Sequence, residues 1–144
     1  MFPAAPNRPK ATILVVDDSP AMVRYLRTML ELDSYQVESA SNGFEALQRL
    51  RSSSPPELVL LDLQMPGMDG LQTLRSLLKL RPDLKVLMCS GVDDPGKMRR
   101  AVTLGARDYL TKPIQHLYLS AAVERCLNSD AHASRTATQA EVTV

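Results

Sequence analysis

The stretch LVLLDLQMPGMDG, residues 58–70, decides the fold of this chain. Its first four residues, Leu58–Leu61, are all apolar, which is typical of a strand buried on both faces of a parallel sheet. Asp62 ends the run, and the glycine and proline residues after it indicate a loop. A helix is predicted to begin at Gly70, so the stretch forms one strand-loop-helix unit.

Outward from this unit, short apolar runs alternate with helical patterns. Two runs are apolar on both faces, Thr12–Val16 and Lys85–Cys89, and two weaker strands are predicted at Gln36–Ser39 and Asp108–Leu110. Alternation of strands and helices with short loops indicates a parallel sheet with right-handed crossovers. We therefore expect an α/β fold, a doubly wound five-stranded parallel sheet flanked by five helices.

The helices are predicted from their caps and apolar stripes. Ser19 is an N-cap with Pro20 at the first helical position, and the apolar stripe after it holds Met22, Val23, Leu26, Met29 and Leu30. A second helix follows Ser41-Asn42, and Pro55-Pro56 is predicted to stop it. The other three run from about Gly70 to Leu80, from an Asp94 cap to just before Gly105, and after Pro113, with Leu119, Ala122, Val123 and Cys126 on the buried face of the last.

Length and composition indicate one globular domain. The 144 residues carry 17 Lys and Arg against 16 Asp and Glu, so a net charge of +1 gives no drive to bind nucleic acid or an anionic membrane. No apolar run is long enough to span a bilayer. Cys89 and Cys126 lack metal-ligand spacing, which favours a reducing cytoplasm. We expect a domain over residues 11–128, a loose N-terminal tail over 1–10 and a C-terminal tail or linker over 129–144.

Polar side chains follow four of the predicted strands, at the edge where an open parallel sheet binds its ligand. Asp17 and Asp18 follow the first strand, Asp62 the third, Ser90 the fourth and Lys112 the fifth. Three carboxylates held close together repel one another unless a cation compensates, and oxygen ligands favour Mg²⁺, with Mn²⁺ also accommodated. Lys112 adds a fixed positive charge for a phosphate, and Ser90 adds a hydroxyl donor.

A carboxylate beside Mg²⁺ and a lysine can act as a nucleophile on phosphorus. Asp62 is the best candidate, because its strand is the most apolar and should hold the carboxylate rigidly. Taken singly, each residue has a plainer explanation: an aspartate after a strand often only caps a helix, a lysine is solvated, and a serine lies in a turn. The joint arrangement at one sheet edge favours aspartyl phosphate chemistry.

Four segments resemble the receiver domain of two-component response regulators, the CheY-like family. They are VVDDS around Asp17-Asp18, LVLLDLQMPGMDG around Asp62, MCSG around Ser90 and GARDYLTKP around Lys112, with matching order and spacing over roughly residues 11–127. The resemblance implies a CheY-like, or flavodoxin-like, fold. It also implies a phosphorylation-dependent signalling switch in the cytoplasm rather than a turnover enzyme.

The resemblance implies a role for each site residue. Asp62 corresponds to the phosphoacceptor, and Lys112 to the lysine that pairs with the phosphoryl group. Asp18 corresponds to a direct Mg²⁺ ligand and Asp17 to a ligand that acts through water, with Asp62 also at the metal. The backbone carbonyl of Gln64 corresponds to the third protein ligand.

The resemblance also implies a switch. Ser90 corresponds to the residue that turns toward the phosphoryl group, and Tyr109 to the aromatic residue that fills the space it leaves. Partner binding would then change on the face formed by the fourth helix, the fifth strand and the fifth helix. Pro113 corresponds to a proline whose preceding peptide bond is commonly cis.

Three positions depart from the family pattern. Gly91 stands where many members have Ala, which leaves the phosphoryl group more open to water and donors. Gln64 stands at a position that often tunes dephosphorylation, either by orienting a water or as a solvated side chain. Ser34 replaces the glycine that often ends the first helix, so Asp33 or Ser34 must accommodate the turn.

The implied phosphoryl donor is a sensor histidine kinase or a histidine phosphotransfer protein, and the implied output is a downstream protein or a fused output domain. Two architectures stay open: a standalone receiver, or the receiver half of a longer regulator. The rival from another class is a Mg²⁺-dependent phosphatase with an aspartyl nucleophile. Such enzymes usually need a second acid two residues after the nucleophile, where this chain has Gln64.

Two further sets of residues have a predicted surface position. A basic patch on the fourth helix, Lys97, Arg99 and Arg100, is either a solvated face or a surface for an acidic partner. His116 and His132 have no acidic neighbours in the sequence, and we expect both at the surface.

Overall fold

The computed structural model describes residues 10–65, 67, 69–91 and 95–128. Its sheet has five parallel strands in the order β2-β1-β3-β4-β5, which confirms the predicted fold class. The strands are β1 (Thr12–Val16), β2 (Gln36–Ala40), β3 (Leu58–Asp62), β4 (Lys85–Ser90) and β5 (Asp108–Thr111). Four of them end one residue later than predicted, so Asp62 and Ser90 are the last residues of their strands.

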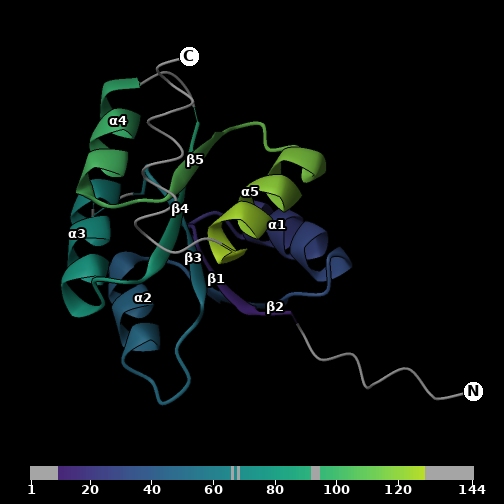
Figure 1. Ribbon diagram of the computed structural model, residues 1–144, viewed down its shortest axis with the longest axis horizontal. Helices are drawn as coiled ribbons and strands as arrows, with labels where there is room; N and C mark the ends of the chain where they lie inside the picture. The colour runs from purple at the N-terminus through teal and green to yellow at the C-terminus, as the bar shows by residue number, and fades with distance from the viewer. Residues whose placement is uncertain (1–9, 66, 68, 92–94, 129–144) are drawn as a thin grey trace, which may run out of the picture.

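Five helices cover the sheet in two layers. They are α1 (Pro20–Leu32), α2 (Gly43–Leu50), α3 (Gly70–Leu80), α4 (Pro95–Leu104) and α5 (His116–Asn128). Figure 1 shows α1 and α5 on one face of the sheet, and α2, α3 and α4 on the other. The Asp94 cap, the expected C-terminal tail (129–144) and all of the expected N-terminal tail (1–10) except Lys10 lie outside the described residues.

The central position of β3 explains the continuous apolar run Leu58–Leu61. All five residues of β3 are buried, because helices cover both faces of the sheet. Leu14 and Leu61 pack into the core beneath α2, α3 and α4. Ile13 and Leu60 point to the other face and pack beneath α1 and α5.

Side-chain caps begin the first three helices. The Ser19 hydroxyl accepts a hydrogen bond from the Met22 amide at 3.3 Å, which confirms the predicted cap of α1. Asn42 caps α2 by accepting from the Glu45 amide at 2.9 Å, and the Glu45 carboxylate accepts in return from the Ser41 amide. Asp69 caps α3. The cap residues therefore fix where each helix leaves the edge that carries the candidate site.

The second helix ends earlier than predicted. We expected Pro55-Pro56 to stop it, but α2 ends at Leu50. The Arg51 amide donates to the Leu47 carbonyl at 3.2 Å, and the Ser52 hydroxyl donates to the Arg49 carbonyl at 2.9 Å. These bonds satisfy the last carbonyls of the helix before the chain reaches the prolines.

The first helix ends in a left-handed turn at Ser34, whose φ is 71°. The Ser34 amide donates to the Glu31 carbonyl at 2.9 Å, and the Tyr35 amide donates to the Leu30 carbonyl at 3.1 Å. This is the geometry that glycine usually supplies at a helix end. The expectation that Asp33 or Ser34 accommodates the turn is confirmed, and Ser34 is the residue that does so.

Polar contacts join the C-terminal end of α1 to the start of α5. Asp33 accepts a hydrogen bond from the Ser120 hydroxyl at 2.5 Å, and its other carboxylate oxygen lies 3.1 Å from His116 Nε2. The Tyr25 hydroxyl donates to the Ile114 carbonyl at 2.6 Å. His116 has no acidic neighbour in the sequence, but the fold places Asp33 beside it from 83 residues away, and the His116 side chain is 42% exposed. His132 lies outside the described residues.

We predict that Ser34→Gly raises the free energy of unfolding by about 0.5–1 kcal/mol, because glycine adopts a positive φ without a Cβ clash. Urea unfolding measures the change. The matched control is Ser76→Gly inside α3, which should lower stability by about 0.5 kcal/mol, since glycine is a poorer helix former than serine. Equal effects of the two substitutions would contradict the prediction.

Candidate functional site

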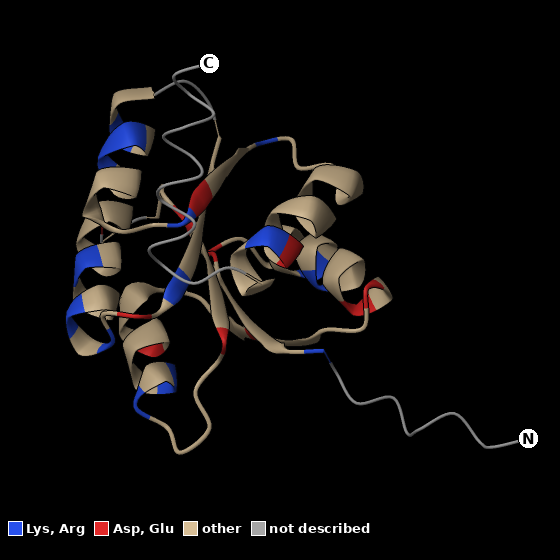
Figure 2. Cartoon of the chain, viewed as in Figure 1, with Lys and Arg blue, Asp and Glu red and all other residues tan. Residues whose placement is uncertain are grey.

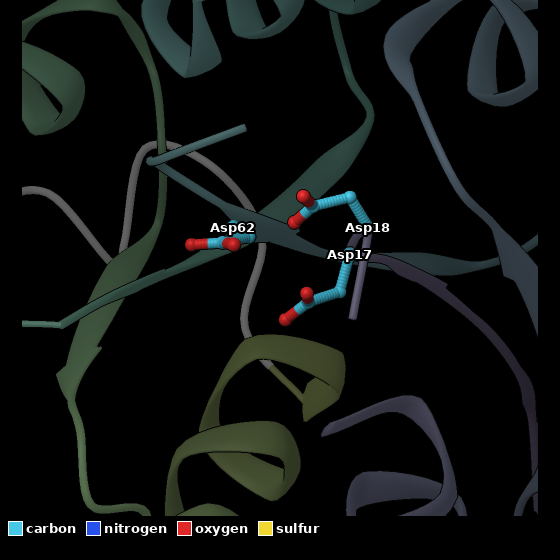
Figure 3. A group of neighbouring side chains, drawn as sticks. All are labelled: Asp17, Asp18 and Asp62. Atoms are coloured by element: carbon cyan, nitrogen blue, oxygen red, sulfur yellow. The ribbon is translucent and has the colours of Figure 1, made fainter. Parts of the chain in front are cut away.

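The predicted site residues meet at the carboxyl edge of the sheet. Asp17 and Asp18 follow β1, Asp62 ends β3, Ser90 ends β4 and Lys112 follows β5. One carboxylate oxygen from each of the three aspartates lies within 4.8 Å of the others. Figure 3 shows the three side chains extending into the same space above the strand ends.

Backbone amides hold the two buried aspartates in place. Asp17 is 3% exposed, and its Oδ1 accepts a hydrogen bond from the Ser19 amide at 2.9 Å. Asp62 is 4% exposed, and its Oδ1 accepts from the Gln64 amide at 3.1 Å. Asp18 is exposed, so the cluster has two buried carboxylates and one that faces solvent.

Lys112 is the cation of the cluster. Its Nζ lies 3.5 Å from Asp62 Oδ1 and 3.7 Å from Asp17 Oδ2. Its backbone amide donates to the Ser90 carbonyl at 2.7 Å, which fixes the start of the β5–α5 loop against β4. The next peptide bond, Lys112–Pro113, is cis, as the family resemblance implied.

The charges of this cluster are unbalanced. Three carboxylates share one lysine ammonium among the residues described at this edge. Burial raises the pKa of Asp62, and the Asp17 carboxylate raises it further, while the Gln64 amide and Lys112 act in the opposite direction. A second cation would relieve this repulsion, and hard oxygen donors in this number fit a divalent ion such as Mg²⁺.

Ser90 adds a hydroxyl without a hydrogen-bond partner. Its side chain is 1% exposed, and its Oγ has no partner among the described residues. A buried polar group in that state gains free energy from any acceptor brought beside it. Cys89, the neighbour of Ser90, is buried in the core toward α1 and α5, and burial raises the pKa of its thiol, so the thiol stays protonated.

Two expected tuning positions are close in space. A Cβ built on Gly91 would lie 3.3 Å from Gln64 Oε1, so the Gln64 side chain lies over Gly91.

Tyr109, 43% exposed, is on the edge strand β5 opposite Met88. Because Met88 is two residues before Ser90, Tyr109 and Ser90 lie on the same side of the sheet.

Sequence reasoning missed the role of one residue at the site. Gly70 was expected only to open α3, but a Cβ there would lie 2.4 Å from the Leu63 carbonyl oxygen. The glycine therefore lets α3 approach the backbone directly after Asp62, which fixes that loop. The Gly70 amide also donates to the Leu63 carbonyl at 3.2 Å. No sequence signal distinguishes such a contact from a flexible loop glycine.

Two surface cavities can be compared with the carboxylate cluster: one lies beside it and the other away from it. One of about 330 Å³ adjoins Asp17 and Asp18 and is lined by Arg24 and Arg27 of α1. A larger one, of about 710 Å³, has mixed charge and includes Lys10, so it lies away from the carboxyl edge. No helix in the described ranges is both long and apolar enough to cross a bilayer.

Fold and site together define a doubly wound α/β protein with an acidic cluster at the carboxyl edge of its sheet. The chain matches the family described as response regulator receiver domain over residues 13–124. It is 35% identical to the transcriptional regulatory protein CpxR homolog of Haemophilus influenzae, over 90% of this chain and 56% of that protein. It is 33% identical to the chemotaxis protein CheY of Listeria monocytogenes, over 78% of this chain and 95% of that protein.

Solved structures agree with these relatives. A response regulator receiver domain protein from Clostridium thermocellum superposes with a TM-score of 0.77 at 32% identity, over 82% of this chain and 94% of that one. The chain therefore belongs to the response regulator receiver domain family. Receiver domains are signalling switches that typically bind Mg²⁺ at an acidic pocket and interact with histidine kinases and fused output domains.

We predict that Gly70→Ala lowers the free energy of unfolding by about 2 kcal/mol, because the new methyl group must displace the Leu63 backbone. The matched control is Gly67→Ala, where no atom lies within 4 Å but φ is 88°. That substitution should cost about 1 kcal/mol from backbone strain alone. Urea unfolding measures both, and a larger loss at Gly67 than at Gly70 would contradict the close-approach argument.

Proposed function

We propose that this chain is a phosphorylation-dependent signalling switch in which Asp62 accepts a phosphoryl group from a sensor histidine kinase or a histidine phosphotransfer protein. One observation carries the proposal: the buried Asp62 carboxylate lies within 4.8 Å of two other carboxylates and 3.5 Å from the Lys112 ammonium. A structural ion pair needs one acid, whereas this cluster holds three. The arrangement suits a site that gathers positive charge around phosphate.

The transfer step follows from these positions. A carboxylate oxygen of Asp62 forms a bond to phosphorus while the P–N bond of the donor phosphohistidine breaks. The electron pair of that bond returns to the imidazole, which takes up a proton from solvent. Lys112 Nζ, already 3.5 Å from Asp62, pairs with a phosphoryl oxygen, and the Ser90 hydroxyl donates to another.

Asp17, Asp18, Asp62 and the backbone carbonyl of Gln64 would hold Mg²⁺, or Mn²⁺ in its place. The ion, when bound, neutralises negative charge on the phosphoryl oxygens. The chain itself orients these ligands before any ion binds. The Ser19 and Gln64 amides orient the carboxylates of Asp17 and Asp62, so little reorganisation is needed on binding.

Output follows from a shift between two conformations. The phosphoryl group gives the Ser90 hydroxyl an acceptor, and the movement of Ser90 frees space for Tyr109 on the same side of the sheet. Tyr109 lies on β5, between α4 and α5, so its rotation changes the α4-β5-α5 face. Partner binding on that face reports the phosphorylation state.

The switch resets slowly by hydrolysis of the aspartyl phosphate and is not a turnover enzyme. The proposed receiver domain spans residues 11–128, with tails at residues 1–10 and 129–144. The chain spans just over half of the CpxR homolog but 95% of the Listeria CheY, which supports either a fused output domain or a separate protein as its downstream partner.

The two free buried cysteines support a location in the reducing cytoplasm.

We predict that incubation with acetyl phosphate or phosphoramidate gives one Mg²⁺-dependent phosphoryl adduct, and that Asp62→Asn abolishes it. Intact-protein mass spectrometry with and without EDTA measures the adduct. The matched control is Asp83→Asn, an exposed aspartate in the α3–β4 loop, which should keep the adduct. An adduct that survives in Asp62→Asn would identify a different phosphoacceptor.

We predict that Gln64→Ala slows the decay of the phosphorylated protein by roughly tenfold, because an attacking water loses an orienting group worth about 1.4 kcal/mol. Gly91→Ala should slow decay as well, since its methyl group presses on Gln64 Oε1. The half-life of the phosphorylated protein measures both effects. The double variant should lengthen this half-life by less than the product of the factors of the two single variants.

The matched control for this series is Gln72→Ala on the exposed face of α3, which should leave the half-life unchanged. Faster decay in Gln64→Ala would show that Gln64 shields the phosphoryl group instead of orienting water.

A further inference from the structure

The lysine of the site lies on a connecting segment and not within a helix or a strand. Lys112 begins residues 112–115, which join β5 to α5 and include a basic position drawn in blue in Figure 2. Its backbone amide donates to the Ser90 carbonyl at 2.7 Å, which fixes the first residue of the segment. The placement of its ammonium beside Asp62 therefore also depends on what holds the rest of the segment.

Tyr25 of α1 holds the middle of this segment. Its hydroxyl donates a hydrogen bond to the Ile114 carbonyl at 2.6 Å, although 89 residues separate the two in the sequence. The Ile114 side chain is 3% exposed and packs into the core beneath α1 and α5. The Leu119 amide donates to the Gln115 carbonyl at 3.0 Å, so the carbonyl held by Tyr25 lies one residue before this acceptor of α5.

Asp33 holds the start of α5. It lies at the end of α1, where Figure 2 draws acidic positions in red. One carboxylate oxygen accepts from the Ser120 hydroxyl at 2.5 Å, and the other lies 3.1 Å from His116 Nε2. Figure 1 shows α1 and α5 on the same face of the sheet. The segment that begins at Lys112 is thus tied to α1 at two separate points.

The same helix orients the acid that faces this lysine. The Ser19 amide donates to Asp17 Oδ1 at 2.9 Å, and the Ser19 hydroxyl caps α1. The other oxygen of this carboxylate, Asp17 Oδ2, lies 3.7 Å from Lys112 Nζ. Because the 13 residues of α1 are joined by internal backbone hydrogen bonds, the helix sets both ends of this ion pair relative to each other.

We propose that Tyr25 and Asp33 are positioning residues for phosphoryl transfer, which hold the segment after β5 so that the Lys112 ammonium lies beside Asp62. The inference rests on the proposed function and deepens it, because it assigns a role in the reaction to two residues outside the carboxylate cluster. Both act through the backbone of the segment and not on the reacting atoms. Preorganised charge beside a transferring phosphoryl group depends on such placement.

A plainer explanation is that these hydrogen bonds only stabilise the contact between two helices. In that case their loss would lower the free energy of unfolding, and the molecules that stay folded would react with a phosphoryl donor at the normal rate. Positioning predicts a slower reaction in folded protein, and it also predicts that the slower rate depends on Lys112. A measurement of rate, made where the protein is folded, separates the two explanations.

The test follows formation of the phosphoryl adduct from phosphoramidate and Mg²⁺ by intact-protein mass spectrometry. In this reaction the Asp62 O–P bond forms as the P–N bond breaks, and ammonia leaves with the electron pair. Tyr25→Phe should slow the reaction by about fivefold, the equivalent of one ordinary hydrogen bond. The matched control is Tyr118→Phe, which removes a hydroxyl from an exposed tyrosine of α5 and should leave the rate unchanged. Circular dichroism checks that both variants are folded.

A double-mutant cycle shows whether the effect passes through the lysine. In a Lys112→Gln background, which reacts more slowly and is followed for longer, Tyr25→Phe should have no further effect on the rate.

Asp33 is tested by rescue. Asp33→Ala should slow the wild-type reaction as Tyr25→Phe does, whereas Asp33→Asn, which keeps an acceptor for the Ser120 hydroxyl, should retain most of the rate.

Two results would overturn the positioning role and leave the proposed switch intact. One is a wild-type rate in folded Tyr25→Phe and Asp33→Ala. The other is an equal slowing by Tyr25→Phe with and without the lysine, which would show an effect that does not pass through Lys112. Absence of any adduct in the wild-type chain would overturn the proposed switch itself, and this inference with it.

Discussion

Two buried carboxylates that share one lysine are the constraint on which the rest of this structure depends. Asp17 and Asp62 are almost fully removed from water, and Lys112 Nζ lies 3.7 and 3.5 Å from their oxygens. Burial of such charges is costly unless they are paired and hydrogen-bonded. The fold supplies this compensation through backbone amides and through a tightly packed pair of central strands, β1 and β3. What remains uncompensated is a deficit of positive charge, which the cation proposed for this site would relieve when it binds.

The parallel sheet explains why these groups meet. Strands that run in one direction deliver their last residues to one edge, so residues far apart in the sequence share a site there. Ser19 joins the site to the fold, because its amide orients Asp17 and its hydroxyl caps α1. Gly70 does the same on the other side of the site, because it lets α3 approach the backbone that follows Asp62. A change at either residue would therefore disturb a helix and the site together.

The alternation of strands and helices, the caps of α1 and α2 and the convergence of the site residues could all be predicted from local patterns. Buried runs, cap residues and the rule for parallel sheets depend on short stretches of sequence. The contacts that were missed depend on distance in space. Asp33 meets His116 across 83 residues, and Gly70 meets the Leu63 carbonyl because two backbones approach each other. The end of α2 was predicted too late, because Arg51 and Ser52 donate hydrogen bonds to its last carbonyls before the chain reaches the prolines. The proline pair alone does not reveal these earlier bonds.

The Ser90 hydroxyl, which has no hydrogen-bond partner among the residues that the structure describes, indicates how the proposed switch would obtain its free energy. A buried polar group without a hydrogen bond costs about 1–3 kcal/mol, and an acceptor placed beside it recovers that amount. A shift of about 1.4 kcal/mol changes the ratio of two conformations tenfold. The cost held at Ser90 is thus of the size needed to bias a two-state equilibrium, and a phosphoryl oxygen at Asp62 is the acceptor that would recover it. The burial that leaves Ser90 without a partner among the described residues also raises the pKa of Asp62, so burial at this sheet edge underlies both the proposed chemistry and the proposed response.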